Sequence, residues 1–305
     1  MSDTNNKQAN LYNSDGSPRE VGVIGHPIEH SLSPAIHNAA FAHYHLPHRY
    51  QKWDVAPSDL LRFLNEAWIG NYLGLNVTVP HKEAVLRYLD EWDDIVEAIG
   101  AANTLLLEAD VLTGYNTDPA GFLEALQRDA NYEPKGKRTL VLGAGGAARA
   151  VVLALASEGA VEIVVANRTF ERAATLVNEI GPLFPNVHIF ATPLDPAAWP
   201  SNRNPRTLVV NTTSLGLLEP DKPFPISPEA LSGRDPDRHT IFFDLTYGDT
   251  PFLKMARPIA AHVLDGLTML VAQGAQSFEL WTGLTAPRDL MLAAARNALT
   301  ARDNH

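Results

Sequence analysis

A glycine-rich segment near the middle of the chain has the residue types and spacing to hold a phosphate group. It reads Gly143-Ala144-Gly145-Gly146-Ala147-Ala148 and lies between an apolar, β-branched run and an apolar helical pattern. In that context a Gly-x-Gly-x-x-Gly/Ala motif binds a dinucleotide: the glycines permit a tight turn and a close approach to the pyrophosphate, and the last small residue lets the helix pack on its strand. The helix N-terminus adds amide donors and a partial positive charge. The segment therefore predicts a dinucleotide site.

The end of the next apolar run indicates which dinucleotide would bind. An NAD site usually has an acidic residue about 20 positions after the glycines, where it accepts a hydrogen bond from the ribose 2′-hydroxyl. Here the run EIVVA ends in Asn167, Arg168 and Thr169, and Arg172 follows. Two guanidinium groups can clamp a 2′-phosphate. We expect NADP rather than NAD, with a local pairing of Glu171 and these arginines as the alternative.

Polar motifs in the first 120 residues could bind a small substrate. They are Ser31-Leu32-Ser33-Pro34, Asn76-Val77-Thr78-Val79-Pro80-His81-Lys82, the pair Asn103-Thr104, and Gly114-Tyr115-Asn116-Thr117-Asp118. Each lies at the end of an apolar run or interrupts one. Ser33 could instead cap a helix that has Pro34 at its first position. Polar groups at strand ends ahead of a nucleotide-binding domain predict a substrate cleft between domains.

Lys82 is a candidate for proton transfer. We expect a helix to begin near Pro80, which would place Lys82 in its first turn. The helix dipole disfavours a positive charge there, and a lysine that releases its proton readily can act as a general acid or base. For an isolated lysine a surface charge is the commoner role. Asp118 could pair with this lysine or cap the following helix.

The elements that must position these residues follow from the apolar pattern. We predict strands over 21–25, 49–55, 72–79, 138–143, 162–167, 187–191, 207–213 and 239–245, adjacent strands or a hairpin around 102–116, and helices over 34–44, 58–68, 147–159, 171–180, 268–282 and 287–301. Strand–helix alternation of this kind predicts an α/β fold with parallel sheets. We expect a disordered leader over 1–20, a substrate-binding domain over 21–117 completed by 266–305, and a Rossmann-type NADP-binding domain over 118–265.

The composition excludes several kinds of protein. The 305 residues can bury about three quarters of the unfolded surface, which is enough for a core without disulfides. The absence of cysteine excludes disulfides, iron–sulfur clusters and a thiolate nucleophile. A net charge of −11 argues against nucleic-acid partners. No apolar run is long enough for a membrane span, and no signal peptide is apparent, so we expect a cytoplasmic protein.

The histidines do not predict a metal site. Four of them, His37, His43, His45 and His48, follow one another closely. His37 and His43 are six positions apart and therefore do not share a helical face. We expect these side chains to lie on the surface or in loops, and we expect no bound metal.

These motifs together resemble the shikimate dehydrogenase family. The resemblance runs from about residue 21 to residue 290 through GVIGHPIEHSLSP, NVTVPHK, IGAANTLL, GYNTD, GAGGAA, NRT, NTTSLG and DGLTMLVAQ. It implies the NADPH-dependent reduction of 3-dehydroshikimate to shikimate in chorismate and aromatic amino-acid biosynthesis. It also implies an N-terminal substrate domain, a Rossmann domain and C-terminal helices that return to the first domain. A monomer or a homodimer is consistent with the sequence.

The resemblance also implies roles for individual residues. Its substrate contacts correspond to Ser31, Ser33, Thr78, Asn103, Tyr247 and Gln273. Its catalytic pair, which also contacts substrate, corresponds to Lys82 and Asp118. Its cofactor contacts correspond to Gly143, Ala144, Gly145, Gly146, Ala147, Asn167, Arg168, Thr169, Arg172, Leu245 and Gly266.

The chain departs from the family pattern at three places, none of which removes a residue assigned to chemistry. Pro119 and Ala120 follow Asp118, Thr268 replaces a usual glycine, and the segment after Tyr247 is short. A quinate or dual quinate/shikimate dehydrogenase and an aminoshikimate-type relative share nearly all these motifs. A nucleotide-binding regulator without catalysis is a further alternative, against which the intact Lys82 and Asp118 argue.

Overall fold

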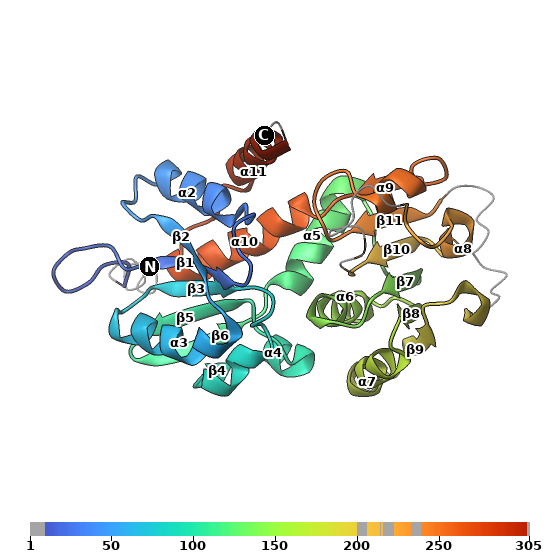
Figure 1. The fold of residues 1–305 in the computed structure, drawn as a ribbon, viewed down its shortest axis with the longest axis horizontal. Coiled ribbons are helices and arrows are strands. Elements are labelled where there is room, and N and C mark those ends of the chain that lie inside the picture. Colours follow the sequence, from blue (N-terminus) through green and yellow to red (C-terminus); the bar gives the residue numbers. More distant parts are fainter. Residues whose placement is uncertain (1–9, 200–205, 214, 216–222, 233–238, 304–305) are drawn as a thin grey trace. The chain divides into compact units, whose positions relative to one another are not determined.

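The computed structural model describes residues 10–199, 206–213, 215, 223–232 and 239–303, and it divides into two compact units. Unit 1 contains residues 1–121 and 270–305, and unit 2 contains residues 122–269. The chain passes from one unit into the other within helices α5 (Asp118–Ala130) and α10 (Leu267–Thr282) (Figure 1).

Unit 1 is built on a six-stranded mixed sheet. Its strands are β1 (Val21–Gly25), β2 (Tyr50–Asp54), β3 (Gly74–Val77), β4 (Glu91–Trp92), β5 (Thr104–Glu108) and β6 (Val111–Tyr115), in the order β2-β1-β3-β5-β6-β4. β1 pairs in parallel with β2 and β3, whereas β5 is antiparallel to both β3 and β6. The helices are α2 (Ser33–His43), α3 (Leu60–Ile69), α4 (Asp94–Ile99) and α11 (Arg288–Asp303), with the 3-10 helices η1 (Pro57–Asp59) and η2 (Ala84–Tyr88). α11 packs beside α2, so the C-terminal helices return to the first unit, as predicted.

Alternation along β3 separates an apolar face of this sheet from a polar one. Leu75 and Val77 join an apolar cluster that includes Leu64 of α3. Asn76 lies between them in sequence and therefore points to the opposite face, where it donates a hydrogen bond to Ser277 of α10. One face of the sheet is thus a core, and the other carries polar groups against α10.

Unit 2 is a doubly wound parallel sheet. Its strands are β7 (Arg138–Leu142), β8 (Glu162–Asn167), β9 (His188–Pro193), β10 (Leu208–Asn211), β11 (Ile241–Asp244) and β12 (His262–Leu264), in the order β12-β11-β10-β7-β8-β9. Its helices are α6 (Gly146–Ser157), α7 (Phe170–Ile180), α8 (Pro228–Ser232) and α9 (Pro251–Ala256), with the 3-10 helices η3 (Gly181–Leu183) and η4 (Pro196–Ala198). This is the Rossmann strand order, in which dinucleotides bind where the order reverses, here beside β7 and β10. The predicted α/β fold class is confirmed, whereas β12, α8 and α9 were not predicted.

Both faces of the unit 2 sheet are buried, which explains its continuous apolar strands. Val141 of β7 lies in one apolar cluster, with residues of α6 and α7. Its neighbours Leu140 and Leu142 lie in a second cluster, with Phe252 of α9. A strand covered on both faces carries apolar residues at successive positions, as a parallel sheet requires.

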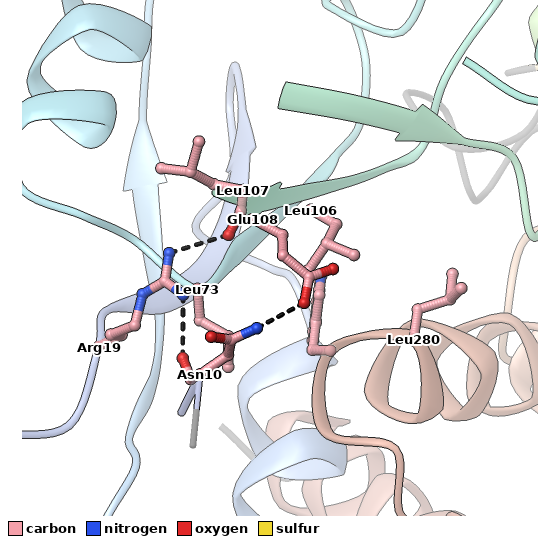
Figure 2. Close-up of a pocket in the computed structure, with 8 residues that line it drawn as sticks. Asn10, Arg19, Leu73, Leu106, Leu107, Glu108 and Leu280 are labelled. Atoms are coloured by element: carbon pink, nitrogen blue, oxygen red, sulfur yellow. Dashed lines mark hydrogen bonds between the residues drawn. The ribbon is translucent and has the colours of Figure 1, made fainter. Parts of the chain in front are cut away.

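The prediction of a disordered leader is wrong for residues 10–20. Leu11 is 1% exposed, and Tyr12 forms an isolated β-bridge with Pro18. The buried Arg19 guanidinium donates hydrogen bonds to four backbone carbonyl oxygens. Those of Asn71 and Tyr72 accept two of them. Those of Asn10 and Leu107, shown in Figure 2, accept the others. The polar composition of this segment suggested disorder, but the hydrogen bonds of the Arg19 guanidinium fix it to unit 1. Residues 1–9, the rest of the predicted leader, lie outside the described residues.

The predicted helix at Pro80 is also wrong. Residues 79–83 form turns, and only the 3-10 helix η2 follows. The buried imidazole of His81 hydrogen-bonds to the Val55 carbonyl oxygen at 2.7 Å, so this turn is tied to the sheet. Lys82 therefore does not lie at an α-helix N-terminus, and the dipole argument does not apply to it. Ser33 is not a helix cap either, because α2 begins at Ser33 with Leu32 in the cap position.

The predicted surface or loop position is wrong for His37, which lies in α2 and is 1% exposed. His48 lies in the loop between α2 and β2, as predicted, but it is buried there, at 6% exposed. His37 stacks on Tyr50, with ring centroids 4.2 Å apart, and His48 stacks on Phe41 at 5.3 Å. Nδ1 of each imidazole has no hydrogen-bond partner among the described residues. Burial lowers the pKa of His37 to about 3, because a charge there would lack both water and a partner.

The buried His37 should make the protein less stable in acid. In the unfolded chain this histidine binds a proton below its ordinary pKa of 6.5, but in the folded protein it does so only near 3. Unfolding therefore becomes easier as the pH falls from 6.5 towards 3. The free energy of unfolding should fall by about 1.4 kcal/mol for each pH unit below 6.5. At pH 5 the buried His37 should therefore have lowered it by about 2 kcal/mol.

Urea unfolding at pH 7 and pH 5 measures this effect. Between pH 7 and pH 5, we expect the free energy of unfolding to fall by about 2 kcal/mol less in His37→Phe than in the parent protein. His37→Gln is a second variant in case the phenyl ring does not fit. His43→Gln, at an exposed position, should behave like the parent. An unchanged pH dependence in both His37 variants would contradict the assignment.

Candidate active site

Three strand termini meet at one edge of the unit 1 sheet. Because β5 runs antiparallel to its neighbours, its first residue lies beside the ends of β3 and β6, and Asn76, Thr104 and Tyr115 are aligned across the three strands. The residues just outside these strands therefore lie near one another. The hairpin geometry brings together polar side chains that are up to 42 positions apart in sequence, from Asn76 to Asp118.

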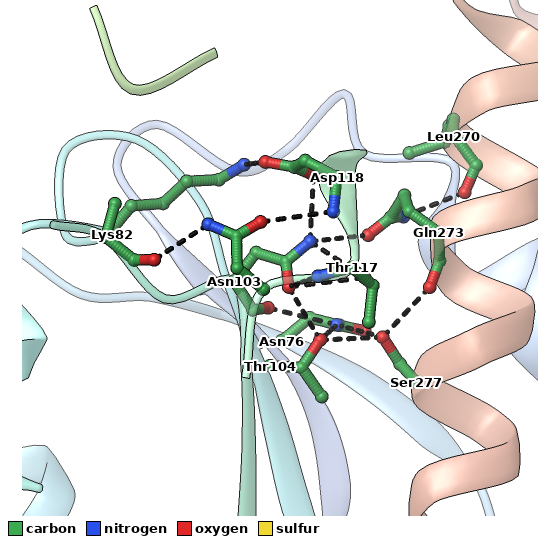
Figure 3. Close-up of polar contacts among 11 residues, drawn as sticks. Asn76, Lys82, Asn103, Thr104, Thr117, Asp118, Leu270, Gln273 and Ser277 are labelled. Carbon is green, nitrogen blue, oxygen red and sulfur yellow. Dashed lines mark hydrogen bonds and ion pairs between the residues drawn. The ribbon is translucent and has the colours of Figure 1, made fainter. Parts of the chain in front are cut away.

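Lys82 and Asp118 form an ion pair at this edge. The Lys82 Nζ lies 2.5 Å from the Asp118 Oδ2, and the two side chains are 21% and 8% exposed (Figure 3). The turn that carries Lys82 is anchored, because the Ala102 amide donates to the Lys82 carbonyl oxygen at 2.9 Å. Asp118 is the first residue of α5, and a side chain engages each of its carboxylate oxygens. An ammonium held here can give a proton to an adjacent oxygen or take one from it.

Asn103 connects this pair to α10. Its Nδ2 donates to the Asp118 Oδ1 at 2.8 Å and lies 3.2 Å from the Gln273 Oε1. The Gln273 Nε2 donates to the Leu270 carbonyl oxygen at 2.8 Å. The structure thus joins four of the predicted site residues, Lys82, Asn103, Asp118 and Gln273, by direct hydrogen bonds.

The hydroxyl candidates lie on the same unit but are less closely joined to the pair. The Ser31 Oγ accepts a hydrogen bond from the Ser33 amide at 3.3 Å, at the start of α2. Thr78 follows β3, and its amide donates to the Ile24 carbonyl oxygen. Ser31 and Thr78 are partly exposed, whereas Ser33 is buried. Tyr247 belongs to unit 2, in the segment after β11.

Helix α10 is placed within unit 1 by a tryptophan on the same helical face as Gln273. Trp281 is buried, its Nε1 donates to the Leu105 carbonyl oxygen at 2.9 Å, and a Cβ on Gly74 would lie 2.2 Å from that nitrogen. Gln273, Ser277 and Trp281 are spaced four apart and share one face. This periodicity was the signal that could have indicated Ser277, a buried polar residue that the sequence analysis missed.

The glycine-rich segment of unit 2 forms the turn between β7 and α6. Gly143 has φ +113°, and a Cβ there would lie 2.3 Å from the Thr212 Oγ1 at the end of β10, so only glycine fits. Gly145 is the N-cap of α6, and no side chain caps the helix. A Cβ on Gly145 would meet no atom of the described residues within 4 Å, so a ligand can approach the backbone closely here. Amides at an accessible helix N-terminus suit the pyrophosphate of a dinucleotide.

Arg168 and Arg172 lie exposed after β8. Asn167 stabilises the turn that contains Arg168, because its Nδ2 donates to the Thr169 carbonyl oxygen at 2.8 Å. Within the described part of the chain neither arginine forms an ion pair with Glu171, so the alternative of local pairing is not seen. Both guanidinium groups therefore remain accessible to a phosphate.

The remaining cofactor candidates lie where β11 and β12 end. A Cβ on Gly266 would lie 1.9 Å from the Leu245 carbonyl oxygen, so the two segments touch through their backbones. The buried Asp244 accepts hydrogen bonds from Asn211 and Thr250, and burial raises the pKa of its carboxyl. The neighbouring Thr268, the residue that departs from the family pattern, is buried in the first turn of α10.

The described residues contain neither a metal-binding cluster nor a membrane-spanning helix. In the segments that the structure describes, no three histidine or carboxylate side chains are grouped to hold a metal ion. No helix among the same residues is long and apolar enough to cross a membrane.

The Rossmann unit with its open helix terminus and free arginines, and the unit with its Lys–Asp pair, define the class of dinucleotide-dependent oxidoreductases. Family comparisons match residues 23–105 to the shikimate dehydrogenase substrate binding domain, residues 124–192 to shikimate / quinate 5-dehydrogenase, and residues 266–296 to the shikimate 5′-dehydrogenase C-terminal domain. The chain belongs to the shikimate dehydrogenase family.

Individual relatives agree with this assignment. The chain is 43% identical to the NADP⁺ shikimate dehydrogenase of Moorella thermoacetica, covering 92% of this chain and 94% of that protein. It is 42% identical to the corresponding enzyme of Methanopyrus kandleri, covering 92% and 96%. The crystal structure of the Thermus thermophilus enzyme with NADP(H) and shikimate has a TM-score of 0.78 at 37% identity, covering 92% and 99%. A 5-ketofructose reductase from Gluconobacter has a TM-score of 0.79 at 32% identity, covering 92% and 98%.

Proposed function

We propose that the protein catalyses the reversible NADPH-dependent reduction of 3-dehydroshikimate to shikimate, a step of chorismate and aromatic amino-acid biosynthesis. The observation that carries the proposal is the partly buried Lys82–Asp118 pair, held at the edge of the unit 1 sheet by Asn103. Relatives with more than 40% identity over nine-tenths of the chain are NADP⁺ shikimate dehydrogenases, which supports the choice of substrate.

The catalytic roles follow from the chemistry of carbonyl reduction. Bound NADPH supplies the hydride to the carbonyl carbon, and the oxygen then needs a proton. We assign Lys82 as the general acid in this direction and as the general base in the reverse direction. Asp118 holds the ammonium group 2.5 Å from its Oδ2 and hydrogen-bonds a substrate hydroxyl. The reaction as written requires no metal.

The remaining polar residues around the pair bind and orient the substrate in this proposal. We assign hydroxyl or carboxylate contacts to Ser31, Ser33, Thr78, Asn103, Tyr247 and Gln273. Of these, Asn103 and Gln273 already lie within hydrogen-bond distance of each other in unit 1. Ser31 favours shikimate over quinate in this proposal, because its small hydroxyl side chain gives the substrate pocket a different shape from the one that a larger residue would give.

The unit 2 residues bind NADP in this proposal. We assign the pyrophosphate to the turn from Gly143 to Ala147 and the 2′-phosphate to Arg168 and Arg172, which Asn167 and Thr169 position. Leu245 and Gly266 contact the nicotinamide side. We propose domain limits of 21–117 with 266–305 for substrate and 118–265 for cofactor.

Steady-state assays with two substrates and two cofactors test the proposal. We expect the highest kcat/KM for shikimate with NADP⁺, and a much lower value with NAD⁺. Quinate oxidised with a similar kcat/KM would instead indicate a dual quinate/shikimate dehydrogenase. A purified, folded protein that oxidises neither substrate with either cofactor would overturn the proposed function.

A further inference from the structure

Beneath the Lys82–Asp118 pair lies a layer of buried polar side chains that none of the proposed substrate contacts explains. Tyr50, Asn76, Thr104 and Ser277 come from β2, β3, β5 and α10, and they are 1%, 6%, 0% and 0% exposed. Buried polar groups of this kind are costly unless each finds a hydrogen-bond partner. Figure 3 shows three of them, Asn76, Thr104 and Ser277, in one continuous network with Asn103 and Asp118.

Backbone groups determine which way both asparagine amides face. The Asn103 carbonyl oxygen can only accept, and it lies 3.1 Å from the Asn76 Nδ2, so the Asn76 Oδ1 must face the Tyr50 hydroxyl at 2.7 Å. The Thr117 amide can only donate, and it lies 2.9 Å from the Asn103 Oδ1. The Asn103 Nδ2 must therefore face Asp118.

The two hydroxyl groups between these amides have one hydrogen each. The Thr104 hydrogen goes to the Asn103 Oδ1 at 2.9 Å, because that oxygen can only accept. Thr104 must then accept from the Ser277 hydroxyl at 2.8 Å. Ser277 in turn accepts from the Asn76 Nδ2 at 2.9 Å. Its alternative acceptor, the Gln273 carbonyl oxygen, is more distant, at 3.1 Å.

All the hydrogen bonds of this chain of side chains consequently point in one direction, from donor to acceptor. In order they are Tyr50, Asn76, Ser277, Thr104 and Asn103, and the last acceptor is Asp118. Burial raises the pKa of Tyr50 well above its usual value, so its hydroxyl keeps its hydrogen. The hydrogen-bond chain thus links Tyr50 of β2 to Asp118, a proposed substrate contact, through the interior of unit 1.

We propose that Thr104 and Ser277 are positioning residues, which hold the Asn103 amide nitrogen on Asp118 and thereby fix the carboxylate that orients Lys82. The inference rests on the proposed function, since it concerns the residues to which that function assigns catalysis. Neither residue touches the reacting atoms in this scheme. Both act through the orientation of Asn103.

The expected kinetic effect follows from the number of partners that remain. Without the Thr104 hydroxyl, the Asn103 Oδ1 keeps only its contacts with Thr117. Ser277 loses the nearer acceptor of its hydrogen and keeps only the more distant Gln273 carbonyl oxygen. No bulk water reaches this buried position to replace the hydroxyl. A displaced or rotated Asn103 amide shifts Asp118, and small misplacements in an active site cost up to about 100-fold in rate.

Thr104 offers a matched pair of variants. Thr104→Val keeps the shape of the side chain, suits a strand and removes the hydroxyl, whereas Thr104→Ser keeps the hydroxyl. We expect Thr104→Val to lower kcat for shikimate oxidation about 10- to 100-fold, with KM for NADP⁺ unchanged. Thr104→Ser should restore kcat to within about 3-fold of the parent. Ser277→Ala breaks the same chain one link earlier and should lower kcat in the same direction.

A control and a double variant separate positioning from general destabilisation. Thr282→Val removes another fully buried hydroxyl of α10. This hydroxyl donates to the Phe278 carbonyl oxygen and is not part of the hydrogen-bond chain from Tyr50 to Asp118. It should lower the melting temperature but leave kcat within about 2-fold of the parent. The Thr104→Val/Ser277→Ala double variant should cost about as much as the worse single variant, because both break one chain.

The outcomes distinguish this inference from the proposed function. A parent protein that does not oxidise shikimate would overturn the proposed function before any variant is compared. An active parent with a Thr104→Val variant of normal kcat would overturn the inference alone. Equal losses in Thr104→Val and Thr104→Ser, or a similar loss in Thr282→Val, would show that stability rather than the hydroxyl is responsible and would also overturn it.

Discussion

Replacing Lys82 with alanine is expected to lower kcat for shikimate oxidation about 100- to 10,000-fold, the usual contribution of a positioned general acid or base. KM for shikimate should change little, because the proton moves only in the transition state, whereas Asn103 and Gln273 remain to bind the ground state. Steady-state kinetics with saturating NADP⁺ measure both parameters.

The control for this variant is an exposed lysine away from the pair. Lys135→Ala, before β7 in unit 2, should keep the kcat and KM of the parent protein. Circular dichroism should show that the Lys82 variant is folded, since the Lys82 side chain is one-fifth exposed and its loss leaves Asp118 hydrogen-bonded to Asn103. Turnover like that of the parent would remove Lys82 from the mechanism.

Replacing Arg168 with aspartate is expected to raise the Kd for NADPH at least about 100-fold. The change removes a charge-assisted hydrogen bond, worth about 1.5–3 kcal/mol, and places a carboxylate beside the 2′-phosphate. A loss of about 2.7 kcal/mol corresponds to the 100-fold change. Arg168 is exposed and forms no ion pair within the described chain, so the folded protein should tolerate the substitution.

The two forms of the cofactor provide the control for this experiment. NADH lacks only the 2′-phosphate, so its Kd should change by no more than a few-fold in Arg168→Asp. Titration of intrinsic or nicotinamide fluorescence measures both constants with the same protein sample. An unchanged Kd for NADPH would show that this arginine does not bind the 2′-phosphate.

Strands β7 to β11 and helices α6 and α7 of the cofactor unit could be predicted because their signals are local. The turn between β7 and α6 is a contiguous motif, and Arg168 follows β8 directly in sequence. Strand β8 has the predicted bounds, since β-branched residues buried on both faces mark it clearly. Elements with a weak local pattern, such as β12, were not predicted.

The N-terminal segment and the turn at Lys82 were predicted less well, because distant partners determine them. Arg19 binds carbonyl groups up to 88 positions away, so a polar segment is ordered by contacts that composition does not reveal. The turn after β3 is tied to Val55 through His81, and this contact replaces the expected helix. His37 is buried against Tyr50 for the same kind of reason.

The sequence by itself determined the Rossmann unit and the preference for NADP, and it indicated the residues to which we assign the chemistry, since each of these depends on neighbours along the chain. Only the tertiary structure decided how Asp118 is held. Its hydrogen-bond chain draws on β2, β3, β5 and α10, which strand pairing and the packing of Trp281 bring together. No periodicity along the chain shows that a serine at position 277 donates to a threonine at position 104. That contact exists because antiparallel pairing places the start of β5 beside Asn76, on the sheet face that α10 covers.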